Sequence, residues 1–150
     1  MIQFIRTNSQ NKGFITLVKK LDAGLAITDG DEHAFYDQFN KIDTIKYVII
    51  GFENNEAVGC GAIKEYDNKT MEIKRMYVDP DFRGNGIASK ILKELEQWAL
   101  ELGYKKCILE TGTRQVEAIA LYTRNNYAKM SNYGQYAGVE NSLCFEKELQ

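Results

Sequence analysis

The chain has 150 residues, a formal net charge of −2 and 44% hydrophobic residues. This length fits one domain spanning residues 1–150, and the near-neutral charge provides no basic surface for a nucleic-acid partner. No apolar run is long enough to cross a membrane, and the first residues lack the apolar core of a signal peptide. We therefore expect a cytoplasmic protein that has no membrane or nucleic-acid partner.

The residues that commonly bind metals are few and scattered. Cys60, Cys107 and Cys144 are far apart and odd in number, and His33 is the only histidine. None has the spacing of a metal site, so we expect no metal and three buried free thiols in a reducing compartment. His33 is expected at the surface or between helices.

The first half of the chain alternates between strand and helix patterns. Residues 2–7 predict a strand, 11–28 a helix with one apolar face, and 31–42 a shorter helix. Three strands are then expected at 46–52, 57–66 and 71–78, separated by short polar turns. Such short connections are typical of an antiparallel meander.

The second half contains the clearest helix, at residues 87–102. Its apolar stripe comprises Ile87, Ile91, Leu92, Leu95, Trp98, Ala99 and Leu102, and Gly103 is a typical helix end. A strand at 105–111, a helix at 114–126 and a closing strand at 142–149 follow. The strand–helix–strand order predicts one parallel pair in a mainly antiparallel, mixed α/β (α+β) sheet of six to seven strands, with helices on both faces.

The turn before the clearest helix, Arg83-Gly84-Asn85-Gly86, has no ordinary capping residue. A helix N-terminus has unpaired N–H groups, and glycines let a ligand approach them closely. The turn therefore favours a phosphate site, although a purely structural turn is an open alternative. The Gly-Lys-Ser/Thr of a P-loop and the third glycine of a dinucleotide fingerprint are both missing.

The order of these motifs resembles the GCN5-related N-acetyltransferase (GNAT) family. The family's Arg/Gln-x-x-Gly-x-Gly/Ala signature, after a strand ending in Val-x-Pro, is matched by Val78, Pro80, Arg83, Gly86 and Ala88. Its Ala-x-x-Leu-Tyr segment on the next helix is matched by Ala118, Leu121 and Tyr122. The chain departs from the pattern at Gln115, where Asn is usual, and at Asn126-Tyr127, where Gly-Phe is usual.

The resemblance implies a central strand pair that splays to admit acetyl-coenzyme A as co-substrate. Main-chain groups near Met76 and Val78 would then pair with the pantetheine arm, and the amides of residues 84–89 would hold the pyrophosphate. The side chain of Arg83 would either face the phosphates or be structural. The implied donor-binding residues are Met76, Tyr77, Val78, Arg83, Gly84, Asn85, Gly86, Ile87, Ala88, Ser89 and Gln115.

The resemblance also implies direct attack by an amine on the acetyl group. Tyr122 would be the general acid for the leaving thiolate, unless it is an ordinary core aromatic. Glu72 is the candidate base, on the expectation that period-two alternation places it on the same face as Met76. Alternatively, Glu72 pairs with Lys74 or lies exposed on a sheet edge. Glu110 is the second candidate and could contact the acceptor.

The acceptor is expected to be the primary amine of a small molecule, with a peptide or protein amine as the alternative. Tyr133 and the tyrosine-rich segment around it could form a wall of the acceptor pocket or simply pack on the sheet. The acidic residues Asp29, Asp31 and Glu32 could attract a cationic amine or cap a helix. A non-catalytic acyl-coenzyme A sensor and a homodimer both remain compatible with the sequence.

Overall fold

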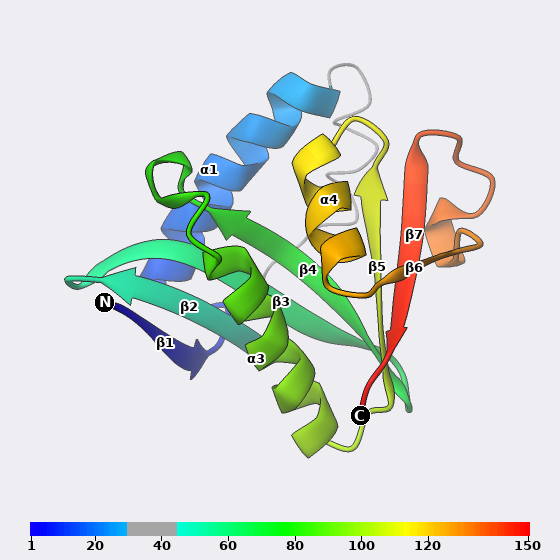
Figure 1. Cartoon of the computed structure of the whole chain (residues 1–150), viewed down its shortest axis with the longest axis horizontal. Helices are drawn as coiled ribbons and strands as arrows, with labels where there is room; N and C mark the ends of the chain where they lie inside the picture. Colours follow the sequence, from blue (N-terminus) through cyan, green and yellow to red (C-terminus); the bar gives the residue numbers. More distant parts are fainter. Residues whose placement is uncertain (30–44) are drawn as a thin grey trace.

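The computed structural model describes residues 1–29 and 45–150 (Figure 1). The helix expected at 31–42, with Asp31, Glu32 and His33, lies outside the described residues. The described elements are β1 (Ile2–Thr7), α1 (Lys12–Asp29), β2 (Tyr47–Glu53), β3 (Glu56–Asp67), β4 (Thr70–Val78), η3 (Pro80–Phe82), α3 (Ile87–Glu101), β5 (Lys106–Gly112), α4 (Val116–Arg124), β6 (Ala128–Met130), η4 (Gly134–Tyr136) and β7 (Ser142–Glu148).

The strands form one sheet in the order β1-β2-β3-β4-β5-β7-β6. Every neighbouring pair is antiparallel except β4 and β5, which are parallel. Figure 1 shows α3 and α4 in front of the sheet and α1 behind it. The mixed, mainly antiparallel sheet with helices on both faces is thus confirmed, and β6 is a strand that the sequence pattern did not indicate.

The hairpin turns explain why β2, β3 and β4 form a meander. Asn54 and Asn55, between β2 and β3, both have positive φ, at 48° and 68°. This backbone matches a type I′ turn, whose twist suits a hairpin and which Asn tolerates well. Between β3 and β4, the Lys69 amide donates to the Asp67 carboxylate over 2.9 Å. Local turn chemistry therefore sets the register of the central strands.

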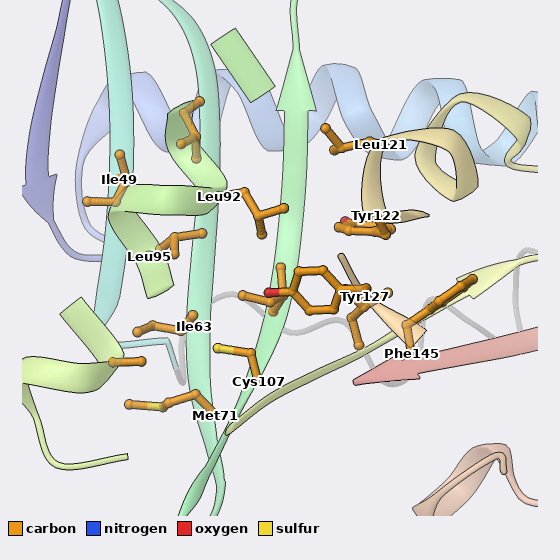
Figure 2. Close-up of a cluster of buried hydrophobic side chains, with 14 of the residues drawn as sticks. Ile49, Ile63, Met71, Leu92, Leu95, Cys107, Leu121, Tyr122, Tyr127 and Phe145 are labelled. Carbon is orange, nitrogen blue, oxygen red and sulfur yellow. The ribbon is translucent and has the colours of Figure 1, made fainter. Parts of the chain in front are cut away.

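The α3 helix packs on the sheet through the apolar stripe expected from the sequence. Ile91, Leu92 and Leu95 are fully buried, and Figure 2 shows Leu92 and Leu95 beside Ile49 and Ile63 of the sheet. The helix ends at Glu101, and Gly103 then takes φ 95°, a conformation that favours glycine. This packing fixes the start of α3 at the carboxyl end of β4.

The opposite face of the sheet is covered by α1. Phe14, Leu17 and Val18 of this helix are buried in a separate cluster with Val48 and Ile50 of β2. The three cysteines are buried free thiols, as expected. Burial raises the pKa of the Cys60 and Cys107 thiols to about 12, so both remain protonated at neutral pH.

Gly61 lets α3 approach β3 closely, which makes the position sensitive to added volume. A Cβ atom there would clash with the Met76 Sδ and would lie 2.8 Å from the Ile91 Cγ2. Gly61→Ala is expected to lower the free energy of unfolding by about 1–3 kcal/mol, as overpacked cores do. Gly24→Ala is the control, because a Cβ there meets nothing within 4 Å and should stabilise α1 by up to about 1 kcal/mol. Urea unfolding of both variants would check this, and equal stabilities would contradict it.

Candidate active site

The central parallel strands separate after a short paired stretch. β4 and β5 pair only at Thr70↔Lys106, Met71↔Cys107 and Glu72↔Ile108, although both strands continue well beyond these residues. The predicted splayed pair is therefore confirmed. A cavity of about 150 Å³ opens here, between β4, β5, α1 and α4. Beyond Glu72, the facing backbone edges of the two strands are not paired with each other.

A β-bulge alters the direction of side chains along β4. Cys60 pairs with Tyr77 and Ala62 with Lys74, so Gly61 lies opposite two residues, Arg75 and Met76. Arg75 takes φ 59°, and its carbonyl accepts a hydrogen bond from the Cys60 thiol over 3.3 Å. A bulge of this kind inserts one extra residue and interrupts the alternation of the strand.

The bulge overturns the expectation that Glu72 and Met76 share a face. Met76 packs on the α3 side, where its Sδ lies near Gly61. The Glu72 carboxylate instead accepts a hydrogen bond from Tyr133, which belongs to the cluster on the other face. Both residues still line the cavity, because the cavity lies where the sheet opens.

The glycine turn forms an open N-terminus for α3. Gly84 and Gly86 have φ 83° and 75°, and a Cβ at either position would meet nothing within 4 Å. Gly86 caps the helix without any side-chain hydrogen bond. Within the described part of the chain, the first-turn amides of Ile87, Ala88 and Ser89 donate no backbone hydrogen bond to another segment. The backbone here offers several unpaired donors at the positive end of the helix dipole, which suits phosphate.

The Arg83 side chain supports the turn. Its Nε donates to the Val78 carbonyl over 2.8 Å, and its guanidinium lies over the Tyr77 ring at 5.4 Å. Its Nη1 is 3.6 Å from the carboxylate of Glu117, in the first turn of α4. Arg83 therefore supports the turn, which is one of the two roles expected for its side chain. The Val78 carbonyl, which was expected to pair with the pantetheine arm, already accepts this hydrogen bond. Asn85 also holds the turn, since its side chain donates to the Phe82 carbonyl over 3.1 Å.

Tyr122 reaches the cavity from α4. Its ring packs edge-on against Tyr127, with centroids 5.8 Å apart, and at a tilt against Phe145 (Figure 2). Tyr122 is 6% exposed and lines the cavity. Burial, with a smaller effect from the negative charge of Glu110, raises the pKa of Tyr122 above its ordinary value. The hydroxyl therefore remains protonated at neutral pH.

The position of α4 relative to α3 is fixed by Asn125. Its Nδ2 donates to the Ser89 Oγ over 3.1 Å and to the Leu121 carbonyl over 2.9 Å. Ser89 belongs to the predicted phosphate turn, and Leu121 adjoins Tyr122. One amide thus connects the phosphate turn to the helix that carries the candidate acid. The next residue, Asn126, stands where the family usually has glycine, and it has φ 72°, a left-handed conformation that Asn tolerates.

Glu72 lies in a polar cluster on the α1 side of the sheet. Its Oε2 accepts a hydrogen bond of 2.6 Å from the Tyr133 hydroxyl, and its Oε1 is 3.7 Å from the Lys74 Nζ. Burial lowers the pKa of Lys74 from its ordinary value, although Glu72 and Glu110 oppose that shift. Tyr133 packs against Tyr66 and Tyr136, and Tyr136 lines the cavity. Tyr133 thus contacts the candidate base directly and packs beside a residue that lines the cavity.

Five residues that were selected from the sequence line one cavity in the structure. They come from β4, β5, α4 and the loop before α4. These are Glu72, Met76, Glu110, Gln115 and Tyr122. Glu110 accepts a hydrogen bond of 2.7 Å from Ser142, and Gln115 is the N-terminal cap position of α4. Tyr77, Val78 and the residues of the glycine turn lie outside this cavity, toward the start of α3.

The sequence analysis did not identify two charged residues of the cavity, Lys74 and Arg75, as site residues. Lys74 could have been found, because it follows Glu72 at period two before the bulge. Arg75 carries no such signal, since nothing in the sequence indicates its positive φ. Across residues 1–29 and 45–150, no cluster of potential metal ligands is found, and no helix is long and apolar enough to cross a membrane.

The splayed parallel pair, the open glycine turn and the buried Tyr122 together define the acyl-coenzyme A N-acyltransferase class. The family model for the acetyltransferase (GNAT) family matches residues 16–127, and the chain belongs to this family.

Individual relatives agree with the assignment. The "IAA acetyltransferase" of Azospirillum brasilense is 35% identical over 102 residues, which cover 67% of each chain. A solved structure from Klebsiella pneumoniae, named for the acyl-CoA N-acyltransferase class, is 32% identical, with a TM-score of 0.84 over 100% of this chain and 99% of that one. A GNAT structure from Elizabethkingia anophelis, with acetyl-CoA bound, is 21% identical and has a TM-score of 0.71 over 99% and 98%. The aligned part spans between 61% and 67% of the length of three such curated relatives and a smaller share of others.

Proposed function

We propose that the protein transfers an acetyl group from acetyl-coenzyme A to the primary amine of a small molecule. The observation that carries this proposal is the cavity, where Tyr122 and Glu72 approach the opening between β4 and β5 from opposite faces of the sheet. The open turn at Gly84 and Gly86 adds a site for the donor's phosphates. The Azospirillum relative is itself named an acetyltransferase.

In the proposed reaction, the amine attacks the acetyl carbonyl directly. The new C–N bond forms, the C–S bond breaks, and the thiolate leaves with the electron pair of that bond. Main-chain amides of β4 near Met76 are the candidates for polarising the carbonyl oxygen. Holding the amine close to the thioester in the cavity would supply much of the rate acceleration.

Two proton transfers accompany this step. Glu72 takes the proton that the amine loses, and the Tyr133 hydroxyl holds the carboxylate in place for that transfer. Tyr122 gives its proton to the leaving thiolate, which its raised pKa allows because the phenol stays protonated. The proton that Glu72 gains and the one that Tyr122 loses are then exchanged through solvent.

The direct test is release of coenzyme A from acetyl-coenzyme A, followed by chromatography, with pools of amines, amino acids, polyamines and peptides. Chromatography is preferred to thiol dyes, because the protein has three cysteines. Release that depends on a small-molecule pool is the expected result. Saturable binding of acetyl-coenzyme A, with no coenzyme A released in the presence of any pool, would instead indicate a sensor. Coenzyme A release with the peptide pool alone would indicate that the acceptor is a peptide or protein amine.

Glu72→Gln tests the base. We expect kcat at pH 7 to fall by about 10²–10⁴-fold, the range for loss of a general base. The amide keeps the shape of the side chain but accepts no proton, so activity should recover as rising pH deprotonates the acceptor amine itself. Glu56→Gln, at an exposed position outside the cavity, is the matched control and should leave the pH–rate profile unchanged. If the pH–rate profile of Glu72→Gln runs parallel to that of the wild type, Glu72 is not the general base.

A further inference from the structure

Arg75 has an unsatisfied buried donor. Its side chain is 4% exposed, and its Nη1 pairs with the Asp22 carboxylate of α1 over 2.7 Å. Its Nε–H has no hydrogen-bond partner, and it is the one buried side-chain nitrogen or oxygen of the described residues in this state. A buried donor without an acceptor costs about 1–3 kcal/mol. Such a group in a native protein calls for an explanation, and a ligand is one.

This unsatisfied donor belongs to a residue that lines the catalytic cavity. Arg75 and Lys74 are consecutive in β4, and both line the cavity with Glu72 and Glu110. The cavity therefore carries two cationic and two anionic side chains. Leu21 and Leu25 of α1 line it as well and contribute an apolar wall.

The chemistry of guanidinium indicates what would satisfy Arg75. Its Nε–H and one Nη–H₂ lie side by side and match the two oxygens of a carboxylate. Asp22 takes Nη1, and Nε, which adjoins the other amino group Nη2, still lacks an acceptor. Lys74 adds a second positive charge beside it, and buried anions are stable only where such partners exist. An uncharged amine or a polyamine offers no oxygen for this donor.

We propose that the acceptor is a zwitterion, an amino acid or a close analogue, whose carboxylate binds Arg75 and Lys74 while its amine faces Glu72. This inference rests on the proposed function and specifies its substrate class. It makes Arg75 and Lys74 specificity-determining residues. Asp22 is a positioning residue, because it holds the guanidinium from the α1 side.

Matched acceptors test the proposal on the unmodified protein. Each amino acid is compared with its carboxamide and with the amine that remains after loss of its carboxyl group. We expect kcat/KM for the best acid to exceed that of both analogues by at least about tenfold, the worth of one charge-assisted contact. Equal kcat/KM values for acid, amide and amine would overturn the zwitterion while leaving the acetyltransferase intact.

Substitutions then locate the carboxylate contact. Arg75→Gln and Lys74→Gln should raise KM for the acid and leave KM for the decarboxylated amine unchanged, with acetyl-coenzyme A affinity also unchanged. Lys129→Gln, at an exposed position in β6, is the control. If the variants weaken acetyl-coenzyme A binding and spare the acceptor KM, the oxyanion is a phosphate of the donor, and the proposal is wrong. Should Arg75→Gln not fold, Lys74→Gln gives the same comparison.

A binding measurement separates this proposal from the proposed function. Calorimetric titration of the protein saturated with coenzyme A uses the same acids and amines and needs no turnover. Binding of an acid, lost in Lys74→Gln, would support the carboxylate site even if no acetyl transfer were found. Acetyl transfer to amines, without any preference for acids in binding or in kcat/KM, would support the acetyltransferase function and contradict the carboxylate site.

Discussion

Replacing Tyr122 with Phe is expected to lower kcat by about 10²–10⁴-fold, the range for loss of a general acid or base. The change removes one hydroxyl and keeps the ring, so the packing against Tyr127 and Phe145 should survive. Acetyl-coenzyme A binding should therefore change little. Initial rates at saturating donor and acceptor, with calorimetric donor affinities, would measure both effects.

The Tyr122 prediction has a close control and a clear contrary result. Tyr47 is half-buried in β2, where its ring meets Trp98 edge-on at 5.3 Å, and it lies outside the cavity. Tyr47→Phe should leave kcat unchanged. A Tyr122→Phe enzyme as fast as the wild type would show that Tyr122 is a packing residue and that solvent protonates the thiolate.

The pH dependence of the wild type follows from the same residue. Burial raises the pKa of the Tyr122 phenol above its ordinary value of 10. A raised pKa keeps an acid protonated to higher pH, so the contribution of Tyr122 persists through the alkaline range and declines only above pH 10. The wild type should thus show no alkaline decline in kcat between pH 8 and 10, within the range where it stays folded.

Gly86→Ala is expected to weaken acetyl-coenzyme A binding by about 10–100-fold. This corresponds to losing one charge-assisted hydrogen bond, worth about 1.5–3 kcal/mol. Gly86 has φ 75°, and its Cβ would occupy the open space beside the first-turn amides of α3. The methyl group touches nothing in the free protein, so its steric effect falls on the ligand. Calorimetric titration with coenzyme A would measure the change.

Gly103→Ala separates backbone strain from ligand contact. Gly103 ends the same helix with φ 95°, and a Cβ there also meets nothing within 4 Å. Alanine in a left-handed conformation costs about 1–2 kcal/mol at either position, so both variants should lose similar stability. Only Gly86→Ala should lose affinity. Equal affinity in the two variants would place the phosphates elsewhere.

The fold was largely predictable because its signals are local. The apolar stripe of α3 marks one face of a helix, and Gly103 marks its end. Asn54 and Asn55 specify a hairpin turn. By contrast, β6 is three residues long and only partly buried, which is too short for a detectable alternation. It is recognisable only through its pairing with β7.

The candidate site was predictable in part, and its failures have a physical cause. The glycine turn and Tyr122 are found by motif, but the bulge at Arg75 depends on how β3 and β4 pair. Strict alternation along β4 predicts that Glu72 and Met76 lie on the same face of the sheet. This prediction is wrong, because the bulge turns Met76 to the other face. The contact between Glu72 and Tyr133 joins residues 61 positions apart. No spacing rule reaches that far, because tertiary packing decides it.

The opening between β4 and β5 has a consequence for how the family can diversify. Beyond Glu72 the two strands are not paired with each other, and every residue except proline carries the same backbone N–H and C=O pair. Side chains along this stretch can therefore be exchanged without erasing its hydrogen-bonding pattern. A scaffold of this kind can therefore keep the same main-chain contacts while the side chains that line its cavity are substituted.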